Sequence, residues 1–191
     1  MKRLLLFLSP ALSVAGPAAA HVDPGAHGAF MAGATHPLFG PDHILAMVAV
    51  GLWAVALGGR ALWTLPATFV AMMGAGFALA LAGMPLVMVE PMILASVLIL
   101  GGLIALAVRM PVAPAAGIVG ALALFHGQAH GAEMGGADTL GYFAGFTLAT
   151  ALLHGAGVLG GYAMARRAGP LATRISGGAV ALAGATLVLA G

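Results

Sequence analysis

Cysteine is absent from the 191-residue sequence, and charged residues make up only 6% of it. Without cysteine the chain has no disulfide, no thiolate metal site and no cysteine nucleophile. A metal ion would therefore need histidine, carboxylate, methionine, backbone carbonyl or water as its ligands. Seven Lys and Arg against five Asp and Glu leave a formal net charge of +2, which comes from a few arginines rather than from a basic face. We expect no nucleic-acid partner.

Hydrophobic residues account for 62% of the sequence, and the mean hydropathy is +1.10. A soluble domain of this size does not need so much apolar surface. The composition therefore predicts an all-α integral membrane protein whose first partner is the lipid bilayer.

The first 20 residues have the three parts of a secretory signal. Lys2 and Arg3 precede an apolar run from Leu4 to Val14, and small residues end the segment at Ala20. We predict cleavage after Ala20, so that residues 1–20 are a signal peptide and residues 21–191 form a single helical transmembrane domain. The alternative is an uncleaved anchor helix, against which the short apolar core argues.

Cleavage at that point would make His21 the new amino terminus, outside the cytoplasm. Its α-amine and imidazole can chelate a divalent metal together, with Asp23 and His27 nearby in sequence. The alternative is a disordered polar leader, so His21 is kept as an accessory site only.

After the leader comes one short apolar segment, followed by six longer ones. Residues 26–35 are too few to cross a bilayer, which takes about 20 apolar residues, and are expected to form a short re-entrant or broken helix. Glycines spaced four apart, such as Gly141 and Gly145 or Gly157 and Gly161, predict close helix packing. The six predicted transmembrane helices are Pro41 to Gly58, Leu62 to Gly83, Leu86 to Val108, Val112 to His130, Thr139 to Ala165 and Leu171 to Ala190.

Arginines mark alternate connections between these segments, and cytoplasmic loops carry the Lys and Arg excess. They are Arg60, Arg109, Arg166, Arg167 and Arg174. The pattern predicts a multi-pass protein of the bacterial inner membrane with a periplasmic mature amino terminus. The acidic residues and most of the histidines then fall at the outer ends of the segments.

Residues 35–47 interrupt the apolar pattern and hold three potential metal ligands, His36, Asp42 and His43. Pro37 disfavours helix at the residue before it, Gly40 loosens the backbone, and Pro41 can begin a helix. A broken helix with ionisable side chains at membrane depth indicates a substrate path. The alternative is a set of helix-capping and interfacial residues.

A second group lies in residues 125–133, Phe-His-Gly-Gln-Ala-His-Gly-Ala-Glu. His126 and His130 are one helical turn apart and share a face, a spacing that suits a transition metal. Gly131 is expected to let the chain turn Glu133 back toward them. The alternative is a pair of histidines that cap a helix and bond loop carbonyls.

Two further residues extend the candidate ligand set. Glu90 places a carboxylate in the first turn of its segment, where it could be a ligand. The alternative is that its side chain extends to solvent. His154 is about 15 residues past Thr139, roughly 22 Å along a helix. It would be a binding site deeper in the membrane on a transport path. A neutral histidine bonded to a neighbouring helix is an equal alternative.

Together the two motifs resemble the HupE/UreJ family of hydrogenase and urease accessory permeases for nickel. The resemblance extends over essentially the whole chain, signal peptide and six spans included. It implies passage of Ni²⁺ from the periplasm to the cytoplasm to supply nickel enzymes, with nickel chaperones as downstream partners. Ni²⁺ is then the cargo, and no prosthetic cofactor is expected. The family signature falls on His36, Asp42, His43, His130 and Glu133.

Ligand chemistry alone leaves other functions open, because imidazole also binds Co²⁺, Cu²⁺ and Zn²⁺. A cobalt permease and a non-transporting accessory protein that delivers or senses metal are the alternatives. An intramembrane metalloenzyme is disfavoured, since no His-Glu-x-x-His helix is present, and we expect no enzyme activity. No nucleotide-binding loop is present, so transport is expected to be passive or coupled to an ion gradient unless a partner supplies ATP.

Overall fold

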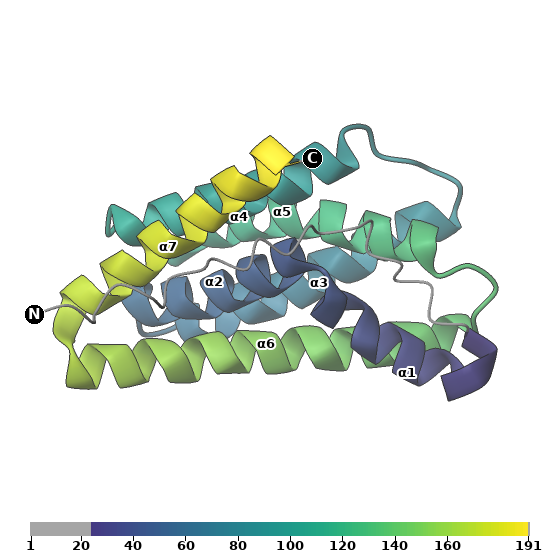
Figure 1. The fold of residues 1–191 in the computed structure, drawn as a ribbon, viewed down its shortest axis with the longest axis horizontal. Helices are drawn as coiled ribbons and strands as arrows, with labels where there is room; N and C mark the ends of the chain where they lie inside the picture. The colour runs from purple at the N-terminus through teal and green to yellow at the C-terminus, as the bar shows by residue number, and fades with distance from the viewer. Residues whose placement is uncertain (1–23, 191) are drawn as a thin grey trace, which may run out of the picture.

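The computed structural model describes residues 24–190, which form seven helices and contain no strand (Figure 1). The all-α class is thereby confirmed. The predicted signal peptide and His21 lie outside the described residues. The helices are α1 (Pro24–Phe39), α2 (Pro41–Leu57), α3 (Ala61–Leu81), α4 (Val89–Ala105), α5 (Val112–Glu133), α6 (Thr139–Arg167) and α7 (Gly169–Ala190).

Each of the six predicted spans is a helix, and these helices fit a multi-pass membrane protein. By length and composition α3, α5, α6 and α7 are able to cross a bilayer, and the bent pair α1 and α2 counts as a fifth span if taken together. Helices α2 and α4 have 17 residues each, fewer than the roughly 20 that an untilted span needs. Six spans therefore stay a prediction.

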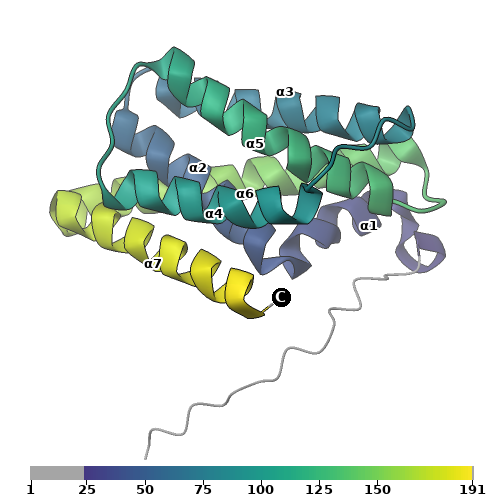
Figure 2. The same cartoon turned by 90° about the horizontal axis from the view of Figure 1, so that it is seen from above.

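Helix α2 is the centre of the bundle and contacts each of the other six helices. Around it α3 packs along α5, α4 along α7, and α1 along α6, as the two views show (Figures 1 and 2). An almost continuous stretch of α2, from Ala46 to Ala54, is buried, as expected of a helix that is apolar all round. The middle of α2 is thus enclosed by the other helices, and its first turn is partly exposed.

Small residues let the helix backbones touch. A Cβ atom at Gly127 would overlap the carbonyl oxygen of Met73, and one at Gly145 would overlap that of Phe30. The first contact joins α5 to α3 and the second joins α6 to α1. The close packing predicted from the spaced glycines is confirmed in the described residues.

Pro37 does not end the first helix, contrary to the sequence-based expectation. Helix α1 continues through His36 and Pro37 to Phe39, and the break follows at Gly40. A proline only disfavours helix at the preceding residue. Here the packing of α1 on α6, where Gly33 lies against the Tyr142 carbonyl, outweighs that local preference.

Gly131 was also misread as a turn residue. Helix α5 runs on to Glu133, three residues beyond the predicted end. A Cβ at Gly131 would lie 2.7 Å from the Cβ of Ala80 and 2.8 Å from the Phe77 oxygen. The glycine is required by the approach of α3, and it keeps Glu133 on the helix one turn after His130.

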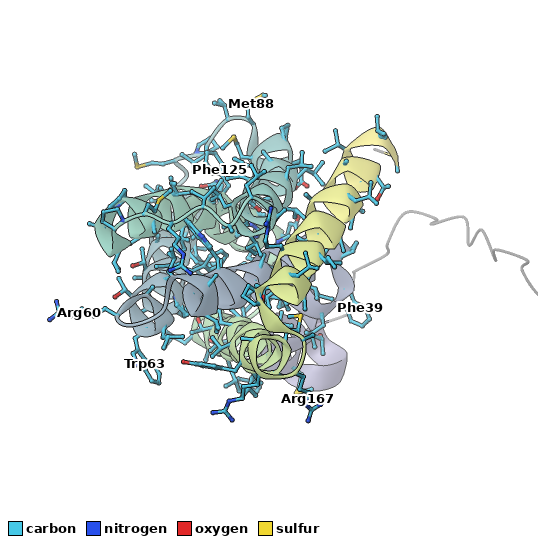
Figure 3. All side chains as sticks on the ribbon, turned by 90° about the vertical axis from the view of Figure 1, so that its left-hand side faces the viewer. Phe39, Arg60, Trp63, Met88, Phe125 and Arg167 are labelled. Carbon is cyan, nitrogen blue, oxygen red and sulfur yellow. The ribbon has the colours of Figure 1, made fainter. Side chains whose placement is uncertain are left out.

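The charged residues are divided between the two ends of the bundle. The five arginines lie near the α2–α3, α4–α5 and α6–α7 connections, of which the α6–α7 turn is at the left of Figure 1. Figure 3 looks onto that side and labels Arg60 and Arg167 there. The described carboxylates belong to the opposite connections and are Asp42, Glu90, Glu133 and Asp138.

Candidate functional site

The break between α1 and α2 brings the end of one helix beside the start of the next. Gly40 has an extended backbone (φ −92°, ψ 107°), Pro41 occupies the first turn of α2, and the two helices are bent by 83°. A Cβ at Gly40 would lie 2.8 Å from Asp42 Oδ1 and 2.9 Å from His43 Nδ1. Glycine is therefore needed here for space beside the polar pair.

Four imidazole rings meet where this break faces α5. The ring centroid of His130 lies 4.8 Å from that of His36 and 4.7 Å from that of His43, and His43 lies 4.8 Å from His126. His126 and His130 are fully buried, whereas His36 and His43 keep 18% and 12% of their side-chain surface. We call these four residues the imidazole cluster. It joins the two sequence motifs.

Asp42 orients His43. Asp42 Oδ1 accepts hydrogen bonds from the backbone N–H of His43 at 2.8 Å and from His43 Nδ1 at 2.9 Å. A carboxylate accepts but does not donate, so the ring proton of His43 sits on Nδ1. His43 Nε2 then carries a lone pair, and it is buried with no hydrogen-bond partner in the described chain.

Ser96 of α4 orients His126 in a similar way. Its hydroxyl donates to the carbonyl oxygen of Ile93 at 2.6 Å and also lies 3.0 Å from His126 Nε2. Because the one hydroxyl hydrogen is given to the carbonyl, Ser96 accepts from His126, and the ring proton sits on Nε2. The lone pair of His126 is left on Nδ1, which is also buried and unpaired among the described residues.

His130 is the most enclosed member of the cluster. Both of its ring nitrogens are buried and without a hydrogen-bond partner in the part of the chain described, and Phe146 lies against the ring at 3.9 Å between centroids. Buried polar groups are nearly always hydrogen-bonded, so both ring nitrogens of His130 are available to a polar partner.

Two carboxylates lie at the outer side of the cluster. Glu133 Oε2 accepts from His36 Nε2 at 2.8 Å, and its side chain is 49% exposed. Glu90, in the first turn of α4, is exposed and close enough to interact electrostatically with Glu133 and Asp42. These acidic groups form the solvent-facing side of the site.

His154 of α6 lies apart from the cluster. The ring of Phe69 lies against His126 and His154, with its centroid 5.4 Å from the former and 4.9 Å from the latter. His154 is 2% exposed, and neither ring nitrogen has a hydrogen-bond partner within the described residues. The two buried imidazoles thus share one aromatic neighbour.

Several neighbours of the site were missed by the sequence analysis. Ser96 is the one polar residue of α4 after its first turn, and that isolation is a signal that could have been used. Phe69 and Phe146 carry no such signal, because phenylalanines in apolar helices are ordinary core residues. Tyr142, whose ring centroid lies 6.1 Å from His36, has a buried hydroxyl unpaired in the described chain.

No three His, Asp or Glu side chains between residues 24 and 190 are already arranged as a closed group around one point. The imidazoles meet edge to face, with interplanar angles of 72° to 87°. The site is therefore a series of neighbouring pairs, running from the exposed pair Glu133 and His36 to the buried His126.

The chain is similar to known proteins over most of its length. The model of a family described as HupE / UreJ protein matches residues 9–187. The chain is also 47% identical over 181 residues to "Protein HupE" of Rhizobium leguminosarum bv. viciae, an alignment that covers 93% of this chain and 94% of that protein. No solved structure matches.

Proposed function

This chain belongs to the HupE/UreJ family, and from that premise we propose that it is a permease that carries Ni²⁺ across the bacterial inner membrane. Transport runs from the periplasm, where the mature amino terminus lies, to the cytoplasm, where nickel enzymes such as hydrogenase or urease are supplied. It needs no ATP. The protein is a transporter rather than an enzyme, and Ni²⁺ is its cargo.

The observation that carries the proposal is the imidazole cluster. Its rings come from α1, α2 and α5, and three of the four have a buried nitrogen that no group of the described chain satisfies. Imidazole and carboxylate ligands bind Ni²⁺ and related ions, and thiolates, which would hold such an ion tightly, are absent. The donor set suits an ion that has to be released again.

The exposure of the side chains gives the path a direction. Glu90, Asp42 and Glu133 attract cations to the mouth, since acidic groups in a confined site raise the local cation concentration. The ion then passes from Glu133 and His36 to the buried cluster. Because neighbouring rings are less than 5 Å apart, one ligand is exchanged at a time, and conduction requires such weak, successive sites.

Asp42 and Ser96 prepare the two rings that they contact. Each hydrogen bond holds the ring proton on the nitrogen that faces away from the ion, which leaves His43 Nε2 and His126 Nδ1 as ligands. Partners of this kind orient metal-binding histidines and raise their basicity. Asp42 thus acts through His43, in addition to its charge at the mouth.

His154 is the next binding site for the ion after the imidazole cluster. The ion reaches it only when the ring of Phe69 moves aside, so Phe69 separates outer binding from inward release. The amine and imidazole of His21 remain an accessory ligand set at the outer side.

Reconstitution into liposomes that hold a metal-sensitive dye tests this function. Purified protein is expected to admit external Ni²⁺ without ATP, and protein-free liposomes are not. Addition of Co²⁺ in competition measures selectivity. Ni²⁺ binding with no flux into the liposomes would refute the permease and favour a protein that delivers or senses metal.

A further inference from the structure

A cavity of about 230 Å³ lies at the arginine end of the bundle, far from the imidazole cluster. Residues of α2, α4, α6 and α7 and of the α4–α5 connection surround it. Its wall is mainly apolar and includes Trp53, Ile104, Val108 and Ala165, and its only charged lining residues are Arg109 and Arg174. An apolar cavity with two guanidinium groups at its edge is complementary to a ligand that has one anionic part and one apolar part.

The two arginines have no carboxylate partner among the described residues, whose acidic side chains all lie at the other end. Arg174 Nε donates to the carbonyl oxygen of Ala105 at 3.0 Å. This bond uses one of the five guanidinium N–H groups and holds the side chain against α4. The remaining donors of Arg174 and those of Arg109 are left for an anion.

Trp53 supplies the apolar wall. It is fully buried, and its indole Nε1 donates to the carbonyl oxygen of Val108 at 3.4 Å. Arg109 follows Val108 directly, so a cationic group adjoins the aromatic surface.

We propose that this cavity binds one anionic phospholipid of the leaflet at the arginine end. The phosphate binds Arg109 and Arg174, and the beginning of an acyl chain lies along Leu103 and Val108, which line the cavity and are partly exposed. A pocket for a complete small ligand measures roughly 300–1,000 Å³, so the smaller cavity takes only this part of the lipid and the chains continue into the bilayer. Basic pockets between membrane helices bind anionic headgroups in this way.

Other ligands fit these groups less well. A metal ion is repelled by two guanidinium groups that no acidic residue of the described chain neutralises. Free phosphate satisfies the arginines but leaves the apolar wall uncovered. A bound lipid bridges the α4–α5 connection and α7, and it is therefore expected to stabilise the folded protein.

The tryptophans provide a direct test, because Trp53 and Trp63 are the only two in the chain. Trp63 is 81% exposed, so Trp63→Phe leaves Trp53 as a reporter in the cavity wall. Its fluorescence is measured in vesicles that contain increasing fractions of brominated phosphatidylglycerol or brominated phosphatidylcholine. We expect half-quenching at a roughly 25-fold lower fraction of the anionic lipid, since each arginine contributes about fivefold.

Removing the two charges in the same background, with Arg109→Gln and Arg174→Gln, should abolish this preference. The matched control is Arg60→Gln with Arg167→Gln, two exposed arginines at the same end that do not line the cavity. The control should keep the preference. Equal quenching by the two lipids, or a preference that survives in the Arg109 and Arg174 variant, would overturn the proposal.

Two measurements on the unsubstituted protein avoid any dependence on variants. Native mass spectrometry should retain one phosphatidylglycerol and no phosphatidylcholine, and retention of neither would refute the site. Thermal unfolding in detergent should be raised by phosphatidylglycerol and not by inorganic phosphate. Equal stabilisation by inorganic phosphate would instead make this a free-anion site. None of these experiments contains Ni²⁺, so their outcome is independent of the transport function.

Discussion

The two ends of the bundle, which both include part of helix α2, differ in the polar groups that they contain. At the start of α2, polar groups point at one another in the interior, and imidazole nitrogens are buried without partners in the described chain. Ten residues after His43 on α2, roughly 15 Å along the axis, Trp53 is buried beside an apolar cavity whose charged groups are confined to the edge. One end gathers imidazoles and carboxylates, and the other gathers arginines beside an apolar cavity.

This difference bears on how a cation would move through the molecule. Carboxylates at one end attract divalent ions, and unneutralised arginines at the other end repel them. An ion that reached the arginine end would have no ligand set there and would leave for water or an acceptor. The following predictions test the separation of the two ends, beginning with the largest effect.

Loss of a central imidazole should have the largest consequence. His43→Ala and His130→Ala are each expected to nearly eliminate Ni²⁺ uptake, because the two rings contact each other and serve the same step. The double variant should be no worse than either single one. Uptake and equilibrium Ni²⁺ binding are compared on equal amounts of membrane-inserted protein. Wild-type uptake in both single variants would contradict a shared site, and losses that multiply would indicate two separate sites.

Loss of the orienting hydroxyl should have a smaller effect. Ser96→Ala removes the acceptor that holds the proton on His126 Nε2, and loss of such a partner typically costs about 10–100-fold in metal affinity. Ser176→Ala is the matched control, since Ser176 also donates to the carbonyl three residues before it, at 2.7 Å, but on α7. Isothermal titration with Ni²⁺ measures both. Equal affinities for the two variants would show that Ser96 does not act on the metal site.

His154→Ala should separate binding from movement. His154 contacts Phe69 and is not in ring contact with the cluster histidines among the described residues, so Ni²⁺ affinity at the outer site should change little while uptake slows several-fold. Stopped-flow dye uptake and equilibrium binding are measured on the same preparation. A parallel loss of binding would place His154 in the outer site and remove the two-stage path.

The smallest effect is expected at the arginine end. Arg109→Gln with Arg174→Gln should change the Ni²⁺ affinity of the imidazole cluster by less than about twofold, because both arginines are exposed at the opposite end of the bundle, where water and salt screen their charge. Isothermal titration at physiological ionic strength checks this. A larger change would mean that the two ends are coupled, and a salt series would then distinguish long-range charge from a change in helix packing.

Local sequence signals predicted most of the secondary structure of this protein and the types of its candidate ligands. The apolar composition, the lengths of the apolar runs and the positions of glycine and proline between them are enough to place the six longer helices, the short helix that became part of α1, and the start of α2 after Gly40. The histidines and carboxylates stand out for the same reason, because polar side chains are rare in such a sequence. These signals are local, so they can be read without knowing which helices are neighbours.

The errors arose where a neighbouring helix decided the outcome. Gly131 and Pro37 were read by their local preferences, yet Gly131 continues a helix because α3 approaches it, and Pro37 continues one because α1 packs on α6. The same cause hid Ser96, whose role depends on a ring that is 30 residues away in the chain.

What the sequence by itself determined, then, is the membrane character of the chain, its helices and the kinds of ligand available, because hydropathy and ligand chemistry belong to each residue. Only the tertiary structure decided that His36, His43, His126 and His130 form one cluster while His154 lies outside it, against Phe69. It likewise decided which ring nitrogens are free, through contacts with Asp42 and Ser96. The physical reason is that side chains from different helices meet only where backbones cross, and the crossing depends on the 83° bend at Gly40 and on glycines that admit a neighbouring helix.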